Sequence, residues 1–176
     1  KKQAFTTMWT KKPIPSLTLN PLSDVCIDAA PFTLSFATPT GGTYYGPGVY
    51  SGMFYPDSAG AGTHYIKYTY TAANGCSNVD SVPVTVNPLP VISASAGANP
   101  VSYGTSTVLD VTVSGSSTYT YAWTPADSLA NPTDANLKSP QTKNLTRPTQ
   151  FDVVVTDAVS SCSSTDNISL GITGGP

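Results

Sequence analysis

The chain has 176 residues, of which 39% are hydrophobic and only 10% charged, with a net charge of −2. That hydrophobic fraction is enough for a packed core, and no apolar run approaches the roughly 18 residues of a membrane span. The lysines and arginines form no cluster beyond Lys1-Lys2 and Lys11-Lys12, which excludes recognition of a nucleic-acid backbone.

The composition favours strands and turns, because the chain has 14 Gly, 16 Pro and 10 Tyr. Residues 4–10 contain a strand-like run whose large apolar groups are Phe5 and Trp9. Pro13-Ile14-Pro15 follows, and the same P-x-P motif recurs as Pro88-Leu89-Pro90. Each proline pair removes two backbone donors and precedes a strand-like stretch. This internal repeat predicts two tandem modules.

A second repeat supports the same division. The pattern C-S-x-x-D occurs at 76–80 and again at 162–166, each time between two strand-like runs. Each module is therefore expected to end with a strand, a tight turn and a strand. We place an extended N-terminal segment at 1–12, the first module at 13–88 and the second at 89–176.

In the first module, short apolar and aromatic runs between glycine-rich bends predict several strands. Alternation along THYIKYTYT places His64, Ile66 and Tyr68 on the inward face and Tyr65 and Lys67 on the outer one. The strands are expected at 15–19, 32–37, 43–45, 49–55, 63–71 and 78–87.

In the second module, TVLDVTV and YTYAWT are expected to pair with each other, and Trp123 is a core candidate. Residues 124–149 are polar and broken by prolines, which predicts an irregular loop with one short strand at most. The strands are expected at 91–96, 106–113, 118–123, 150–156 and 164–172. Short strands with frequent turn signals predict an all-β chain of two tandem immunoglobulin-like β-sandwich domains.

The chain resembles the repeats of large surface proteins of Bacteroidota, the adhesin type exported by type IX secretion. The first module resembles their Ig-like repeats through VCIDAAPFTLSFATPTGGTYYGPGV, FYPDSAGAGTHY, YTYTAANGCS and the P-x-P linker. The second resembles the related PKD-like repeats through TYTYAWTPADSL and FDVVVTDAVSSCSSTD. The resemblance implies an extracellular, cell-surface spacer or adhesive module without enzymatic activity.

The resemblance also implies a disulfide between Cys26 and Cys76, since the cysteine after the Asn-Gly turn pairs with one near the start of such a module. In the second module Ser102 stands where that early cysteine is expected. Cys162 is then a lone buried thiol that packs like a small apolar residue, or it forms an intermolecular disulfide.

Catalytic and metal sites find little support. The chain has one histidine, His64, expected in a structural role at a strand end, and no G-x-S-x-G nucleophile elbow. The cysteine spacing matches no zinc site, and we expect no cofactor. Structural calcium is the alternative, with Asp24 and Asp28 near Cys26 and Asp127 and Asp134 in the long loop. Without a D-x-D-x-D-G pattern, turn and capping roles are expected for these aspartates.

Two kinds of glycan contact are suggested by the sequence. Exposed aromatic rings stack on sugars, so Tyr44 and Tyr45 by the glycine-rich bend, together with Trp9, are candidate sugar contacts; core packing is the alternative. In the resembled group, O-glycans attach at Asp-Ser/Thr followed by a small or apolar residue. Candidate O-glycosylation sites are Ser58, Ser81 and Ser128, with Ser58 and Ser128 expected to be the more accessible, and candidate N-linked sites are Asn144 and Asn167.

Aligning the two proline pairs places residues 5–12 where 80–87 lie, so the N-terminal segment looks like the last strand of a missing module. It is either the remnant of a longer repeat chain or a donor strand, carrying Phe5 and Trp9, that joins copies head to tail. We therefore expect a non-catalytic extracellular structural or adhesive protein, part of a filament or adhesin stalk. Its expected partners are copies of itself, neighbouring repeats or surface glycans. The alternative is a carbohydrate-binding or spacer module of a secreted polysaccharide-degrading enzyme.

Overall fold

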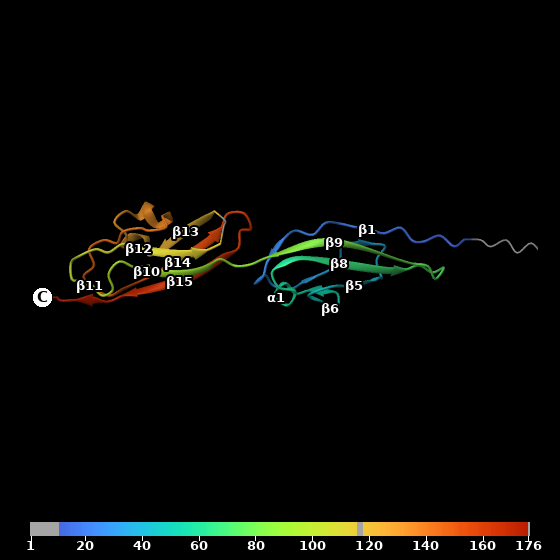
Figure 1. Cartoon of the computed structure of the whole chain (residues 1–176), viewed down its shortest axis with the longest axis horizontal. Helices are drawn as coiled ribbons and strands as arrows, with labels where there is room; N and C mark the ends of the chain where they lie inside the picture. The colour runs from blue at the N-terminus through green and yellow to red at the C-terminus, as the bar shows by residue number, and fades with distance from the viewer. Residues whose placement is uncertain (1–10, 116–117, 176) are drawn as a thin grey trace, which may run out of the picture. The chain divides into compact units, whose positions relative to one another are not determined.

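The computed structural model describes residues 11–115 and 118–175. It is almost entirely β-structure and divides into two compact units, Lys1–Val86 and Asn87–Pro176 (Figure 1). Both units are immunoglobulin-like β-sandwiches, so the predicted fold class is confirmed. Phe5 and Trp9, the predicted assembly strand, lie outside the described residues.

The first domain packs a four-stranded sheet over shorter strands. The larger sheet has the order β2 (Val25–Cys26), β9 (Ser77–Asn87), β8 (Gly62–Thr71), β5 (Thr43–Tyr45). The facing strands are β3 (Phe32–Thr33), β7 (Met53–Phe54) and β6 (Val49–Tyr50), while β1 (Thr18–Leu19) pairs with β4 (Ala37–Thr38) and α1 is one turn at Pro56–Ala59.

The core of this domain follows the alternation of the long strands. Ile66 and Tyr68 of β8 are buried, whereas Tyr65 and Lys67 between them are exposed, as predicted. Phe54 completes the centre of the core, with no exposed surface. The strand expected at 49–55 is instead the hairpin β6–β7. Its turn is built on Ser51-Gly52, whose φ angles of 49° and 76° reverse the chain.

The second domain has one three-stranded and two two-stranded sheets. The three-stranded sheet has the order β13 (Tyr119–Thr124), β14 (Thr149–Asp157), β15 (Ser163–Leu170). In one two-stranded sheet β10 (Val91–Ala96) pairs with β12 (Leu109–Ser114), and in the other β11 (Val101–Ser102) is parallel to β16 (Ile172–Thr173). Trp123 is a core residue with 1% of its surface exposed, as predicted.

One expectation for the second domain needs correction. The strands in TVLDVTV and YTYAWT do not pair, because β12 pairs with β10 and β13 with β14, each adding to a different sheet. Residues 125–148 form an irregular loop, as predicted, with the 3₁₀ turns η1 (Ala126–Ser128) and η2 (Pro132–Asn136) and single bridges such as Val108↔Gln141. Prolines at 132, 140 and 148 lack the N–H that a continuous ladder would need.

Candidate functional site

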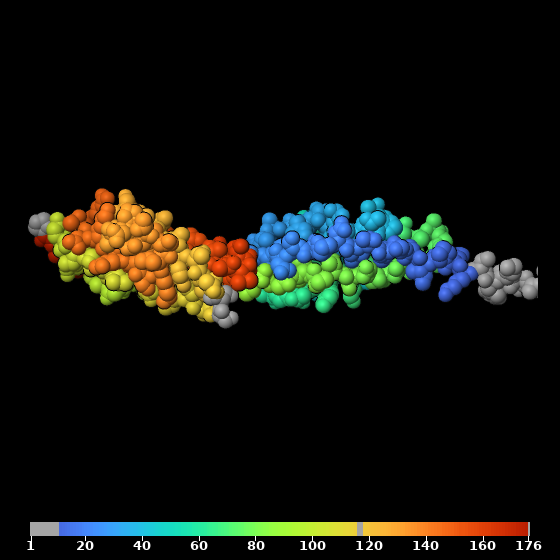
Figure 2. Space-filling view, turned by 90° about the horizontal axis from the view of Figure 1, so that it is seen from above, coloured from blue at the N-terminus to red at the C-terminus, as the bar shows by residue number. Residues whose placement is uncertain are grey.

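The chain enters and leaves each domain at opposite ends of the sandwich. In the first domain, Pro13 lies beside the turn that precedes β9, because the Asn74 side chain donates to its carbonyl at 2.9 Å. The chain leaves after the 11 residues of β9, about 34 Å away at about 3.4 Å per residue. Figure 2 shows the first described residues, in blue, along the surface beside the green of β9.

The second domain repeats this arrangement. Ser164, near the start of β15, donates from its hydroxyl to the Pro90 carbonyl at 2.6 Å, which fixes the point of entry. The exit strand β16 follows the far end of β15, at Leu170. The path from Ser164 to Leu170 spans about 20 Å of strand.

One side-chain hydrogen bond recurs at the point of entry. In the first domain Asn78 Nδ2 donates to the Pro15 carbonyl at 2.9 Å, just as Ser164 donates to Pro90. Asn78 and Ser164 both stand two residues after the cysteine of C-S-x-x-D, and each acceptor is the second proline of its pair. The two sequence repeats are therefore the two partners of one hydrogen bond, which joins the entry segment to the second strand of the final hairpin, β9 or β15. Sequence reasoning found both repeats but not this bond.

Further contacts bind the first and last segments of the second domain. The Asp166 carboxylate accepts the Ala94 N–H at 2.8 Å, across from β15 to β10. The Asn99 amide donates to the Ser169 carbonyl at 2.9 Å and accepts the Gly171 N–H at 3.0 Å. Together with the parallel β11–β16 pair, these bonds join the first segments of the domain, from β10 to β11, to its last segments, β15 and β16.

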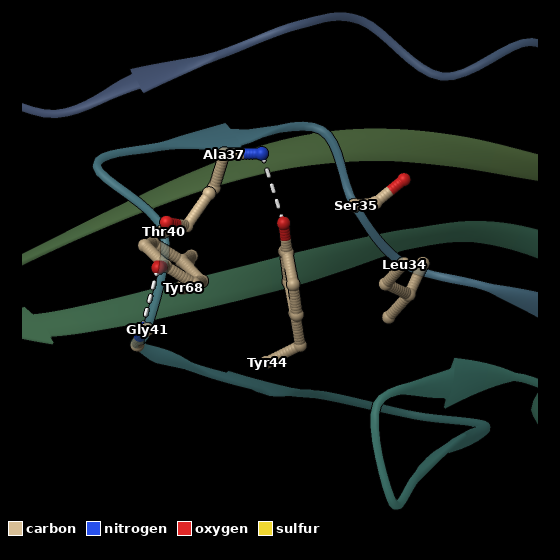
Figure 3. A pocket seen from close by; sticks show the side chains of 8 residues that line it. Leu34, Ser35, Ala37, Thr40, Gly41, Tyr44 and Tyr68 are labelled. Carbon is tan, nitrogen blue, oxygen red and sulfur yellow. Dashed lines mark hydrogen bonds between the residues drawn. The ribbon is translucent and has the colours of Figure 1, made fainter.

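A pocket of about 240 Å³ opens in the first domain beside the bend that connects β4 to β5 (Figure 3). The Tyr68 hydroxyl donates to the Pro39 carbonyl and accepts the Gly42 N–H, both at 2.7 Å. The Tyr44 hydroxyl accepts the Ala37 N–H at 2.8 Å. These phenols hold the bend against the sheet, so their hydroxyls are used mainly within the fold.

Glycine at 42 is required by this close approach. A Cβ there would overlap the carbonyl oxygen of Thr69 and lie 2.6 Å from the Tyr68 hydroxyl. The Tyr44 ring packs against Tyr68 with centroids 4.6 Å apart, and against Phe36 at 5.0 Å. The pocket wall is therefore an extension of the core.

The candidate sugar contacts do not share one surface. Tyr44 and Tyr45 are successive residues of β5 and point to opposite faces of the sheet. Tyr44 is half-buried in the pocket wall, while Tyr45 is 41% exposed on the outer face. Trp9 lies outside the described residues.

The predicted Cys26–Cys76 disulfide is wrong, because Cys76 is a free thiol. The Asp24 carboxylate accepts the Thr85 N–H at 3.0 Å, so β2 lies near the end of β9 that is remote from Cys76. About eight strand residues, or roughly 27 Å, separate these places, far beyond the reach of a disulfide. Cys26 and Cys162 are both disulfide-bonded, so the expectation that Cys162 is a lone thiol is also wrong.

The candidate glycosylation sites differ in accessibility. Ser58, in the short helix α1, and Ser81, on β9, are exposed, whereas Ser128 in η1 is half-buried. Ser128 is therefore less accessible than Ser81, the reverse of the expectation, because η1 packs against the domain. Asn144 in the long loop and Asn167 on β15 are both exposed.

The ionisable groups show structural roles. His64 donates from Nε2 to the Gly60 carbonyl at 2.8 Å, and Asp134 accepts the side-chain amide of Asn131 at 3.3 Å. Asp127 and Asp28 are exposed. Over residues 11–115 and 118–175, no group of three or more His, Cys, Asp or Glu is placed to hold a metal ion.

The carboxylate of Asp110 has a lowered pKa. The hydroxyl of Ser139 donates to Asp110 Oδ1 at 2.6 Å, and Lys138 lies 3.3 Å from the same oxygen. The Ser139 hydrogen bond, aided by Lys138, lowers the pKa of Asp110 despite a smaller opposing effect of burial. This group lies at the surface and has no catalytic partner among the described neighbours.

No protein-family model matches the chain. No curated protein matches it either. Among solved structures, the amphioxus IgVJ-C2 molecule is 13% identical with a TM-score of 0.39, covering 63% of this chain and 60% of that one. Drosophila OTK extracellular domains 3–5 are 13% identical with a TM-score of 0.38, covering 92% and 63%. The Bacteroides ovatus glucan-locus protein SGBP-B, in complex with a mixed-linkage heptasaccharide, is 17% identical with a TM-score of 0.29, covering 92% and 46%.

The chain thus spans less than two thirds of each of these three structures. Within the described residues, no helix is long and apolar enough to cross a membrane.

Proposed function

We propose that the chain is a non-catalytic, extracellular structural or adhesive protein whose tandem Ig-like domains form part of a cell-surface filament or adhesin stalk. The supporting observation is that the chain enters and leaves each domain at opposite ends, with a side-chain tie at each entry. A domain connected in this way spans the distance between its neighbours in sequence.

The bonding of the second domain suits a load applied along the chain. Tension between its ends pulls β11 and β16 in opposite directions along their axes, because the two strands are parallel and belong to the entry and exit sides. Their hydrogen bonds, Val101 N–H to Gly171 and Tyr103 N–H to Thr173, then share the load in shear. The two bonds of Asn99 act in the same direction.

The cellular setting rests on chemistry rather than on the fold. Disulfide-bonded Cys26 and Cys162 fit an oxidising compartment such as the cell exterior. Exposed Ser58 fits O-glycosylation, which would solvate a surface carrying few charges. The N-terminal segment 1–12 remains our candidate for joining copies head to tail by strand addition.

Single-molecule force spectroscopy on the full chain, pulled from its two ends, tests the load-bearing role. We expect Asn99→Ala to lower the unfolding force of the second domain, because it removes two bonds between the entry and exit segments. Thr120→Ala, on the exposed face of β13, is the control and should leave that force unchanged. Equal unfolding forces for both variants would contradict the proposed load path.

Electron microscopy tests assembly separately. Ordered filaments formed by the full chain and lost on deletion of residues 1–12 are the expected result for strand-mediated joining. Filaments that survive the deletion would rule out that segment as the connector. Dispersed particles for both forms would leave a stalk role and eliminate a filament.

A further inference from the structure

The outer face of the larger sheet in the first domain is open to solvent. This outer face consists of the residues of β5, β8 and β9 that point away from the core: Thr43, Tyr45, Thr63, Tyr65, Lys67, Thr69, Thr71, Ser77, Val79, Ser81, Pro83 and Thr85. Tyr65 is 57% exposed and Val79 50% exposed. A sheet face that displays aromatic rings to water is a candidate binding surface.

Strand register places two of the tyrosines around one lysine. Tyr45 lies directly opposite Lys67, and Tyr65 lies two residues along β8 from that lysine, so the two tyrosines are diagonal neighbours at about 7–8 Å. The Thr69 hydroxyl donates to the Tyr45 hydroxyl at 3.5 Å, which draws the Tyr45 ring along β8 away from Tyr65. Tyr45 and Tyr65 are therefore both neighbours of Lys67 on this face.

The remaining side chains of the outer face are mostly hydroxyls. Thr71 and Ser77 are hydrogen-bonded to each other at 2.8 Å, and Thr63 and Thr85 approach within 3.5 Å. No Trp, Phe, Leu, Ile or Met belongs to the face, and its apolar side chains besides the tyrosines are Val79 and Pro83. Rings with polar edges amid hydroxyls fit a ligand that is itself rich in hydroxyls.

The charge of the outer face narrows the ligand class further. Lys67 is the single charged residue among these positions, and the Asp24 carboxylate lies beside the sheet at Thr85, whose N–H it accepts. Among the described residues, the one salt bridge involves Lys138 in the other domain, so the Lys67 ammonium is available to an external anion.

We propose that this face binds an acidic polysaccharide whose sugar rings stack on Tyr45 and Tyr65 and whose carboxylate groups pair with Lys67. An open sheet face that carries two exposed rings suits a polymer strand better than an enclosed small molecule. Such a site would let the proposed stalk adhere to a polysaccharide. The proposal rests on the proposed function only because it requires the chain to be extracellular.

Affinity electrophoresis and calorimetry of the full recombinant chain, made without glycosylation, test the site. The probes are polygalacturonate and alginate, with fully methyl-esterified polygalacturonate as a charge-free match. We expect Tyr65→Ala and Tyr45→Ala each to weaken binding by about 2- to 10-fold through lost ring stacking. Lys67→Gln should weaken binding by about 2- to 5-fold and flatten its salt dependence.

Tyr50→Ala and Lys143→Gln are the matched controls, since both residues are exposed but lie outside the outer face. Failure of the wild-type chain to bind either uronate polymer would overturn the proposal, as would equal binding of the methyl-esterified form. Self-association that Tyr65→Ala abolishes, without glycan binding, would instead assign the face to a second copy. None of these outcomes depends on the force measurement.

Discussion

The bond between Asp166 and the first strand of the second domain allows a quantitative test. Asp166→Ala leaves the half-buried Ala94 N–H without its 2.8 Å acceptor. Hydrogen bonds to charged groups contribute about 1.5–3 kcal/mol. Asp166 is only half-buried and its other bond is local, to the N–H of Asn167, so we expect the lower part of that range. A loss of about 1.5–2 kcal/mol would lower the melting temperature of the domain by roughly 6–16 °C.

Fluorescence of Trp123 reports unfolding of the second domain, because this residue is buried in the domain's core. Trp9→Phe provides the background in which Trp123 is the single tryptophan. Asp152→Ala is the matched control: it removes the same charge from an exposed position whose carboxylate accepts only the Gln150 amide among the described contacts. A stability loss for Asp166→Ala no greater than for Asp152→Ala would refute the claim that Asp166 holds the first strand.

Three other outcomes follow from contacts described above. Gly42→Ala should destabilise the first domain by about 2–3 kcal/mol in chemical denaturation, because its methyl group would displace Tyr68; a loss below 0.5 kcal/mol, of the order of an ordinary surface change, would show that the bend relaxes freely. Ser139→Ala should raise the pKa of Asp110 in an NMR titration, since it removes the largest cause of the lowering. Because the pKa of Asp110 is lower in the folded than in the unfolded chain, Asp110 stabilises the fold above its unfolded pKa. That contribution is lost as the pH falls through the folded pKa, so Ser139→Ala should make stability less sensitive to acid. An unchanged Asp110 titration in Ser139→Ala would contradict the role assigned to Ser139. Ser81 faces Lys67 across the sheet, so protein carrying a glycan at Ser81 should lose polysaccharide binding in affinity electrophoresis, and retained binding would place the ligand elsewhere.

The sequence predicted the larger features because they arise from local rules. Alternation along β8 placed Ile66 and Tyr68 inward, and the large apolar side chain of Trp123 indicated a core position. The two C-S-x-x-D repeats correctly located the final hairpins, β8–β9 and β14–β15. These features depend on residues close together in the chain.

The errors involve partners far apart in the chain. The pairing of β10 with β12, and the placement of β2 near Thr85 rather than near Cys76, depend on how separate segments pack. Periodicity shows which side of a strand is apolar but not which strand lies beside it. The outer face was missed for the same reason, since Tyr45 and Tyr65 become neighbours only through strand register.

The side-chain hydrogen bond at the entry of each domain, from Asn78 to Pro15 or from Ser164 to Pro90, suggests how similar domains can be recognised. The acceptor is a main-chain carbonyl, at Pro15 or Pro90, which substitution of its side chain does not remove. The donor is an amide in Asn78 and a hydroxyl in Ser164, separated from its acceptor by 63 and 74 residues. The two domains thus make corresponding bonds through different chemical groups. Further copies are better sought by a proline pair and any short polar donor two positions after the hairpin cysteine than by residue identity.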